Sequence, residues 1–203
     1  MHPNPQFRSE DRALLEALIE EIGFGMVFLT TPDGPRVAHT PLLSTEDGAI
    51  QFHLSRGNAL TRHLDGATAL ITVNGPDSYI SPRWYAQRDT VPTWDYVALE
   101  LEGRVRRMAE EGLEAFLLTL IEKHEARLSG EPWRAGEAGP ELWASQLRGI
   151  VGFELEVLAW RPTLKLSQKK SPAERAGIAA GLEAAGAAGL AQLMRSLPGR
   201  DAA

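Results

Sequence analysis

The sequence predicts a mainly β or α+β protein built on an antiparallel barrel with peripheral helices. Short apolar segments alternate with turn-rich segments over residues 25–107, which is typical of strands joined by hairpins. Few connections are long enough for parallel crossovers, so a doubly wound parallel sheet is disfavoured. The 203 residues, 43% of them hydrophobic, are enough to bury one good core. We expect one domain over residues 1–170 and a helical C-terminal tail over residues 171–203.

The first expected element is an amphipathic helix over residues 9–22. Its leucines and isoleucine recur at helical spacing. Ser9 and Asp11 supply N-terminal capping groups, and Gly23 supplies a stop. The pattern then changes to three short strands joined by the turn Pro32–Gly34 and an acidic turn that ends at Gly48. These strands are expected at residues 26–31, 37–43 and 49–55.

The same pattern continues to the C-terminus without an internal repeat. After a short helix, two further strands extend the meander. Two helices separated by a linker with glycine, proline and Trp133 precede the last strand, and two weak alanine-rich helices follow Lys165. In chain order, we expect a helix at 58–64, strands at 67–73 and from Tyr96 to about 108, helices at 110–128 and 140–147, and a strand at 149–160.

The charge balance disfavours nucleic acid as a partner. The formal net charge is −6 and the pI is near 5.4, whereas DNA affinity depends largely on clustered Lys and Arg. A nucleic-acid role needs a local basic patch, and the candidates are short and more typical of solvated surface. They are Arg104, Arg106 and Arg107 in one group, and Lys165, Lys169 and Lys170 in another.

The cysteine count and the hydropathy of the sequence indicate the cellular compartment. The chain has no cysteine, which excludes disulfides and thiolate-ligated metals. It also has no apolar run of about 18 residues and no charged-then-apolar leader. We expect a soluble cytoplasmic protein with no membrane partner.

The most informative local motif is HLSRGN at residues 53–58. An apolar strand ends there in a hydroxyl, a guanidinium and an amide group, and a helix is expected to begin. Helix N–H groups beside an arginine fork can bind a phosphate monoester. The alternative is an Asn or Ser helix cap beside a solvated Arg56, and spacing alone favours that alternative.

Aromatic residues are concentrated between residues 79 and 96, although they make up only 7% of the chain. Flat rings there can wall a heteroaromatic ligand, with Ser81, Thr93 and Asp95 as polar groups. A core or dimer-interface cluster explains the same pattern equally well. The aromatic residues are Tyr79, Trp84, Tyr85, Trp94 and Tyr96.

Two shorter segments carry weaker signals. His39 precedes Pro41, which denies the sheet one backbone donor and suggests an edge or a bulge. The segment 165–170 offers amine and amide donors to an anion or to a carbonyl-rich ring. A plain edge strand and a solvated basic stretch are the alternatives.

Several chemistries find no support in the sequence. There is no G-x-S-x-G elbow, no H-E-x-x-H spacing and no G-x-G-x-x-G between a strand and a helix. His124 and Glu125 are adjacent, so their side chains point apart on a helix. We therefore expect no metal site and no dinucleotide-binding fold, and we name no catalytic residue.

Taken together, these dispersed motifs resemble the PaiB-type FMN-binding negative transcriptional regulator family. The likeness runs from about residue 1 to about residue 182, and its spread makes it more specific than any single motif. It is carried by Met1-His2-Pro3, Phe7, Gly23-Phe24-Gly25, His39, Pro41-Leu42-Leu43, residues 53–58, Gly75-Pro76, Ser78–Pro82, Trp84-Tyr85, Val91–Trp94, Tyr96, Gly103, His124-Glu125, Trp133, Ile150–Gly152, Glu154 and Lys165–Gln168.

That family is similar to the pyridoxamine-phosphate-oxidase-like split barrels, which bind FMN at a homodimer interface. The resemblance therefore implies an antiparallel split β-barrel, FMN as cofactor and a homodimer. It also implies that Ser55, Arg56 and Asn58 hold the phosphate, with His53 nearby.

The resemblance further implies contacts with the isoalloxazine ring. The second expected strand contributes His39, Thr40 and Pro41. The strand at the end of the aromatic cluster, in this subunit or its partner, contributes Trp94, Asp95 and Tyr96. The C-terminal motif contributes Lys165 and Gln168.

The chain departs from the family pattern at two positions. Asp95 stands where the family usually has Asn, which replaces an amide that can donate with a carboxylate that only accepts when ionised. Lys169 follows Gln168 where the family usually has Asn. These changes put the flavin contacts of this part of the chain in question.

Three functions compete. The resemblance favours a flavin-linked regulator that reports to DNA or to a protein partner. Related split barrels also host FMN-dependent oxidoreductases that act on small molecules, and a fold does not fix function. A degenerate pocket, or one holding another planar ligand such as haem near His39, His53 or His124, ranks last because the sequence has no haem signature.

Overall fold

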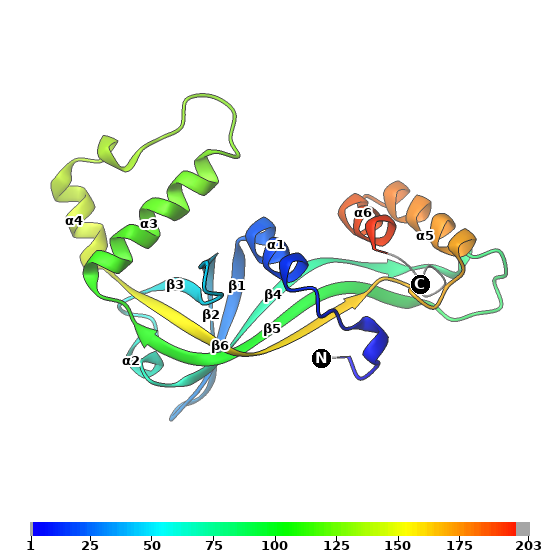
Figure 1. Cartoon of the computed structure of the whole chain (residues 1–203), viewed down its shortest axis with the longest axis horizontal. Coiled ribbons are helices and arrows are strands. Elements are labelled where there is room, and N and C mark those ends of the chain that lie inside the picture. The colour runs from blue at the N-terminus through cyan, green and yellow to red at the C-terminus, as the bar shows by residue number, and fades with distance from the viewer. Residues whose placement is uncertain (1, 198–203) are drawn as a thin grey trace. The chain divides into compact units, whose positions relative to one another are not determined.

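The computed structural model describes residues 2–197, so Met1 of the N-terminal motif and the last six residues of the expected tail lie outside the described part. Within it the chain alternates strands and helices in the order expected from the sequence (Figure 1). The strands are β1 (Phe24–Thr31), β2 (Gly34–Ser44), β3 (Ile50–Ser55), β4 (Thr68–Ile80), β5 (Thr93–Arg107) and β6 (Ile150–Lys165). The helices are α1 (Arg12–Ile22), α2 (Thr61–Leu64), α3 (Glu110–Glu125), α4 (Pro140–Arg148), α5 (Pro172–Ala184) and α6 (Ala188–Ser196), with single 3₁₀ turns η1 (Pro5–Phe7), η2 (Pro82–Trp84) and η3 (Ala135–Glu137).

The strands form a closed barrel in the order β1-β2-β3-β6-β5-β4. The pairs β1–β2, β1–β4, β2–β3 and β3–β6 are antiparallel, and β3 meets β6 with His53 opposite Gly152. Closure leaves the barrel without free edges. The predicted class, mainly β or α+β with an antiparallel barrel, peripheral helices and a helical C-terminal segment, is confirmed. Within residues 2–197, no helix has the length and apolar character needed to cross a bilayer.

The chain divides into two compact units, which we describe separately. The barrel unit holds Glu16–Val73 and Leu101–Trp160. Of the described residues, the terminal unit holds 2–15, Asn74–Glu100 and 161–197. Strands β4, β5 and β6 contribute residues to both units. The expected domain boundary at residue 170 stays a prediction.

The barrel unit has a core of alternating inward side chains. Phe52 of β3 and Phe153 of β6 stack inside it with ring centroids 5.5 Å apart, and both are fully buried. Helix α3 covers the sheet from outside through Leu113, Phe116 and Leu120, which pack against Leu43 of β2 in a second apolar cluster. That helix is therefore fixed beside the ends of β3 and β6.

The terminal unit is organised around a helical hairpin. Helix α5 begins with a capping box between Ser171 and Glu174. It packs on η2 because two glycines leave room for Trp84: a Cβ at Gly181 would lie 2.4 Å from the indole ring, and one at Gly177 would lie 2.8 Å from the Trp84 carbonyl. The Arg175 guanidinium donates to the carbonyl groups of Met194 and Leu197, which ties the end of α6 to α5.

Candidate functional site

The loop between β3 and α2 contains the motif predicted to hold a phosphate. The backbone N–H of Asn58 donates to the Ser55 carbonyl at 2.9 Å, and the Asn58 Oδ1 accepts from the backbone N–H of Leu60 at 2.9 Å. The Ser55 Oγ accepts from the Gly57 N–H at 3.4 Å. Ser55 and Asn58 therefore shape a tight turn before α2 rather than cap that helix, and the Ser55 hydroxyl keeps its proton free to donate.

Helix α2 cannot supply the helix-terminus contribution that the sequence suggested. It contains only four residues and has no side-chain cap. A helix this short carries little of the aligned dipole that draws anions to longer helices. An anion at this loop would depend on side-chain charge, and above all on Arg56.

Arg56 is exposed and held in a defined direction. Its backbone N–H donates to the Gly149 carbonyl at 2.8 Å, its Nε donates to the Arg148 carbonyl at 2.9 Å, and its Nη2 donates to the Ile150 carbonyl at 3.3 Å. These bonds anchor the guanidinium to the start of β6. They leave its Nη1 amino group free to donate to a ligand.

A pocket of about 450 Å³ lies in the barrel unit beside Arg56. It brings together the end of β5, the first turns of α3, the end of α4 and the start of β6, over a partly apolar floor. Three arginines and three glutamates line it. The full lining is Arg56, Arg107, Met108, Ala109, Glu110, Glu111, Leu113, Glu114, Ala144, Leu147, Arg148, Ile150, Val151 and Gly152.

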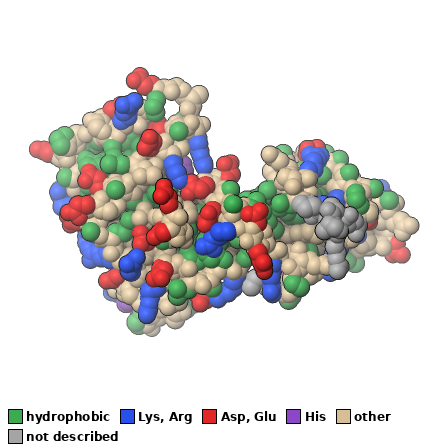
Figure 2. Space-filling model, viewed as in Figure 1, with side chains coloured by type: hydrophobic (Ala, Val, Ile, Leu, Met, Phe, Trp, Pro, Cys, Tyr) green, Lys and Arg blue, Asp and Glu red, His purple; other side chains and the backbone are tan. Residues whose placement is uncertain are grey.

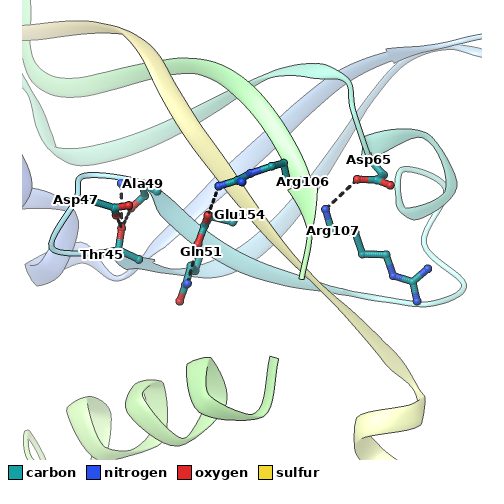
Figure 3. A network of polar contacts seen from close by, with 8 residues as sticks. All are labelled: Thr45, Asp47, Ala49, Gln51, Asp65, Arg106, Arg107 and Glu154. Carbon is teal, nitrogen blue, oxygen red and sulfur yellow. Dashed lines mark hydrogen bonds and ion pairs between the residues drawn. The ribbon is translucent and has the colours of Figure 1, made fainter. Parts of the chain in front are cut away.

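The arginines of this pocket have spare donors. Arg107 donates its backbone N–H to Asp65 at 2.9 Å, while its guanidinium points away from Asp65 and Glu154 (Figure 3). The neighbouring Arg106 is instead paired with Glu154 at 2.9 Å. Among the described residues, no ion pair joins Arg56, Arg107 or Arg148 to the pocket glutamates. We call this group of three guanidiniums the arginine pocket.

Sequence reasoning missed Arg107 and Arg148 as binding candidates. Arg107 stands in the group with Arg104 and Arg106 that is typical of solvated surface, and Arg148 carried no signal in the sequence. The antiparallel pairing of β3 with β6 brings Ser55 opposite Ile150, and thereby brings Arg56 beside Arg148. Only the pairing between β3 and β6, which are distant in the sequence, shows that Arg56 and Arg148 are neighbours.

The β2 residues of the predicted flavin site face in opposite directions. His39 is exposed, and Pro41 is partly exposed. Thr40 between them is only 1% exposed, and its hydroxyl donates to the His53 carbonyl at 2.7 Å. His39 and Pro41 are therefore available to a ligand on the outside of the sheet, whereas Thr40 fixes β2 to β3.

His53 is the least satisfied polar side chain of the predicted set in the barrel unit. It is partly buried, its ring lies 5.8 Å from that of Phe116 of α3, and its Nδ1 is buried without a hydrogen-bond partner. Burial lowers the pKa of His53 below its usual value because the charged form loses solvation. The imidazole is therefore neutral at physiological pH. Its Nδ1 can form a hydrogen bond with a ligand.

The other predicted residues belong to the terminal unit. Trp94 is 50% exposed, its Nε1 donates to Asp77 at 3.0 Å, and its ring meets the edge of Tyr79 with centroids 6.3 Å apart. Tyr96 is partly exposed. Trp94 is thus a rigidly held ring with a free face.

Asp95 is fully buried within a polar cluster of the terminal unit. The Ser167 hydroxyl donates to its Oδ2 at 2.5 Å, and the Lys165 Nζ lies 3.7 Å from its Oδ1. Lys165 also donates to Thr93 at 2.5 Å and to the Trp94 carbonyl. Burial raises the pKa of Asp95, and the hydrogen bond from Ser167 and the charge of Lys165 offset part of that rise.

The C-terminal motif folds onto itself. The Gln168 Oε1 accepts from the Leu166 N–H at 2.8 Å, and its Nε2 donates to the Leu164 carbonyl. Ser167 has a φ of 54°, an uncommon conformation for a residue other than glycine. Lys165 and Gln168 therefore satisfy groups of their own unit in this structure, and Lys169 is exposed. Over the described range, no group of His, Asp and Glu is arranged to hold a metal ion.

The fold and the site define a class: a six-stranded antiparallel barrel with an arginine-lined pocket at the end of β3. The model of the family described as "Putative FMN-binding domain" matches residues 1–159, and the chain belongs to this family. The Bacillus subtilis protein named "Protease synthase and sporulation protein PAI 2" is 32% identical over 157 residues, which cover 75% of each chain.

Solved structures share the fold. An FAD- and heme-binding protein from Mycobacterium smegmatis has a TM-score of 0.60 at 20% identity and covers 77% of this chain and 72% of its own. The flavocytochrome Anf3 from Azotobacter vinelandii has a TM-score of 0.54 at 18% identity, with 80% and 74% covered. The expected cofactor is confirmed by the family: FMN is the cofactor of this chain.

Proposed function

We propose that the barrel unit holds the phosphate of FMN at the arginine pocket, and that the protein acts as a flavin-linked regulator. The arginine pocket carries this proposal. Three guanidiniums with spare donors line a cavity of about 450 Å³ together with three glutamates, of which Glu114 accepts a hydrogen bond from Trp143. Arginine forks match phosphate oxygens in charge and in geometry. Ser55 adds a hydroxyl, and Asn58 holds the loop in shape.

The outer side chains of β2 and β3 suit the isoalloxazine ring. His39, Pro41 and the unpartnered Nδ1 of His53 offer polar and flat groups on the outside of the sheet. A carbonyl- and nitrogen-rich ring edge would satisfy the buried imidazole, which otherwise costs free energy. When bound, FMN supplies redox chemistry, while these residues bind and orient it.

The homodimer belongs to the proposal as well. The outward face of β1 and β2 exposes Phe24 (51%), Phe28 (36%) and Val37 (44%), and Phe28 lies opposite Val37 in the sheet. Contiguous exposed apolar side chains typically mark an interface. We infer that a second copy covers this face. The exposed ring of Trp94 is then the member of the terminal-unit group best suited to contact a partner's flavin.

The regulatory part of the proposal rests on the likeness to the sporulation-related PAI 2 protein. Direct DNA binding is a weaker component because the net charge is −6. A gel-shift assay at low salt, with oxidised and reduced protein, tests it. Redox-dependent retention of DNA supports the regulator. Turnover of NADH with a small acceptor, without any DNA retention, supports the alternative of an FMN-dependent oxidoreductase.

The phosphate assignment can be tested by titrating flavin-free protein with FMN and with riboflavin, which lacks the phosphate. We expect Arg107→Ala and Arg148→Ala each to weaken FMN binding by roughly 10- to 100-fold, since a hydrogen bond to a charged group contributes about 1.5–3 kcal/mol. Riboflavin binding should change little.

The matched control is Arg36→Ala, an exposed arginine that lies outside this pocket. It should bind both flavins like the parent protein. Equal losses for FMN and riboflavin in the arginine variants would contradict a phosphate contact. A colourless protein that takes up neither flavin would contradict the whole proposal.

A further inference from the structure

A second concavity lies in the barrel unit, lined by residues of α3 and of the segment that leads from α3 toward α4. Its volume is about 540 Å³, and none of its residues lines the arginine pocket. Apolar groups, two carboxylates and one guanidinium surround it. The lining residues are Leu118, Ile121, Glu122, Glu125, Ala126, Pro132, Trp133, Arg134 and Ala135.

One wall is a face of α3 that the core does not use. Leu118, Ile121, Glu122 and Glu125 follow the i, i+3, i+4, i+7 spacing of a single helical face. The residues that pack on the sheet, Leu113, Phe116 and Leu120, lie on another face. Leu118 is nonetheless 44% exposed. The helix thus presents an apolar stripe beside acidic groups to the concavity.

The opposite wall is held in place by hydrogen bonds. The backbone N–H of Trp133 donates to the Glu125 Oε2 at 2.9 Å, and the backbone N–H of Arg134 donates to the Glu137 Oε1 at 2.8 Å. The segment from Pro132 is therefore anchored to α3 and to η3. The concavity is formed before any ligand arrives, which reduces the ordering cost of binding.

The chemistry of the lining selects a cation. The Trp133 side chain is 39% exposed, and an indole face attracts ammonium groups. Glu122 makes no side-chain hydrogen bond or ion pair among the described residues, and Glu125 uses one oxygen for the Trp133 N–H. With two carboxylates and the single guanidinium of Arg134, the lining carries a net negative charge. In Figure 2, hydrophobic, acidic and basic side chains are interspersed over α3 and α4.

We propose that this concavity binds a small organic cation with an apolar body, such as an aromatic or alkyl ammonium compound. The ammonium group lies between the Glu122 carboxylate and the Trp133 ring, and the apolar body covers Leu118 and Ile121. The site is independent of the flavin site, and the proposal does not rest on the proposed function.

Calorimetric titration of the full chain with benzyltrimethylammonium tests the site. We expect Glu122→Gln to weaken binding about 3- to 10-fold, and Trp133→Leu to weaken it by a similar factor, which corresponds to about 0.7–1.4 kcal/mol and is the magnitude of a partly exposed cation–π contact. Trp133→Phe should restore part of the loss because it keeps an aromatic face. Glu46→Gln, an exposed carboxylate on the β2–β3 turn, is the control and should leave binding unchanged.

Benzenesulfonate tests the sign of the charge, because it keeps the ring and reverses the charge. It should not bind. Equal binding of the two probes, or cation binding that survives both Glu122→Gln and Trp133→Leu, would overturn the proposal. Circular dichroism of each variant verifies the fold, and titration of FMN-saturated protein should give the same affinity for the cation.

Discussion

At the scale of single residues, two buried polar side chains contribute to the pH dependence of stability. His53 and Asp95 are both desolvated, and in both cases burial is the largest cause of the shifted pKa. Their shifts have opposite directions, since burial disfavours a charged imidazole and a charged carboxylate alike. Each residue therefore makes a distinct prediction.

Replacing His53 by glutamine should remove a loss of stability in acid. The pKa of His53 is lowered in the folded protein, so on acidification the unfolded chain takes up the proton first. Stability is lost as the pH falls through the unfolded-state value, near about 6.5. Urea unfolding of flavin-free protein at about pH 7.5 and about pH 5.5 should show a smaller loss for His53→Gln than for the parent. The exposed His39→Gln should behave like the parent; a parent-like acid loss in His53→Gln would contradict this account.

Replacing Asp95 by asparagine should stabilise the folded protein near neutral pH. The pKa of Asp95 is raised, so folded-state stability falls as the pH rises through that value. An amide avoids the cost of burying a charge, can still accept from Ser167, and leaves Lys165 with Thr93 and the Trp94 carbonyl as acceptors. Thermal unfolding at several pH values should show a gain for Asp95→Asn that shrinks on acidification. A loss at neutral pH would mean that the Lys165 pair outweighs desolvation.

At the scale of secondary-structure elements, the sequence located every strand but placed some ends too early. Strand β4 was expected to stop at Val73. It continues to Ile80, and Gly75 serves close packing there, since a Cβ would lie 2.9 Å from that of Val97. Strand β6 likewise runs through Pro162 to Lys165. Both strands thus continue through a glycine or a proline, residues that weaken a strand pattern in the sequence without necessarily ending it.

Two glycines in the barrel unit give a matched test of close packing. A Cβ at Gly103 of β5 would lie 2.1 Å from the Glu156 carbonyl oxygen, and backbone atoms cannot move aside cheaply. Gly103→Ala should therefore destabilise the protein by about 3 kcal/mol or more. Gly112 in α3 meets nothing closer than the Met108 Cβ at 3.9 Å.

Gly112→Ala should in contrast stabilise the protein by about 0.5–1 kcal/mol, because alanine is the better helix former. Chemical denaturation of both variants beside the parent measures the two effects. Equal effects of the two substitutions would show that strand spacing at Gly103 is not the constraint.

At the scale of the whole molecule, family and fold could be predicted from the sequence, whereas the residues of the proposed phosphate site could be predicted only in part. The motif at residues 53–58 predicts Arg56 as a phosphate ligand, because its residues are neighbours in the chain. Arg107 and Arg148 join it only through strand pairing. Both polar groups of the Gln168 side chain form hydrogen bonds with nearby backbone groups. No sequence motif indicates these hydrogen bonds. Local patterns specify elements, while the register between distant strands specifies the pocket.

The proposed homodimer predicts the effect of a charge on the outward face of β1. Phe28→Glu would place a carboxylate in an apolar contact, where burying it without a partner is costly. A stable interface buries about 800 Å² on each partner. Because Phe28→Glu would disrupt the apolar contact on which this interface depends, the variant should be monomeric. Light scattering after size-exclusion chromatography measures the mass. Leu142→Glu on α4, an exposed position of another element, should remain dimeric; a monomeric parent protein would contradict the dimer itself.

Strand β5 also limits how the sequence can change during evolution. Its buried positions are alternate residues from Asp95 to Val105 without interruption. Because side chains alternate with a period of two, a single inserted or deleted codon within this stretch would turn every later inward residue outward. The alternation is not interrupted at any of these residues, so the strand offers no irregular position that could absorb the error. Length variation among relatives should therefore be confined to connections such as residues 85–92 and 126–139, while β5 keeps a constant length.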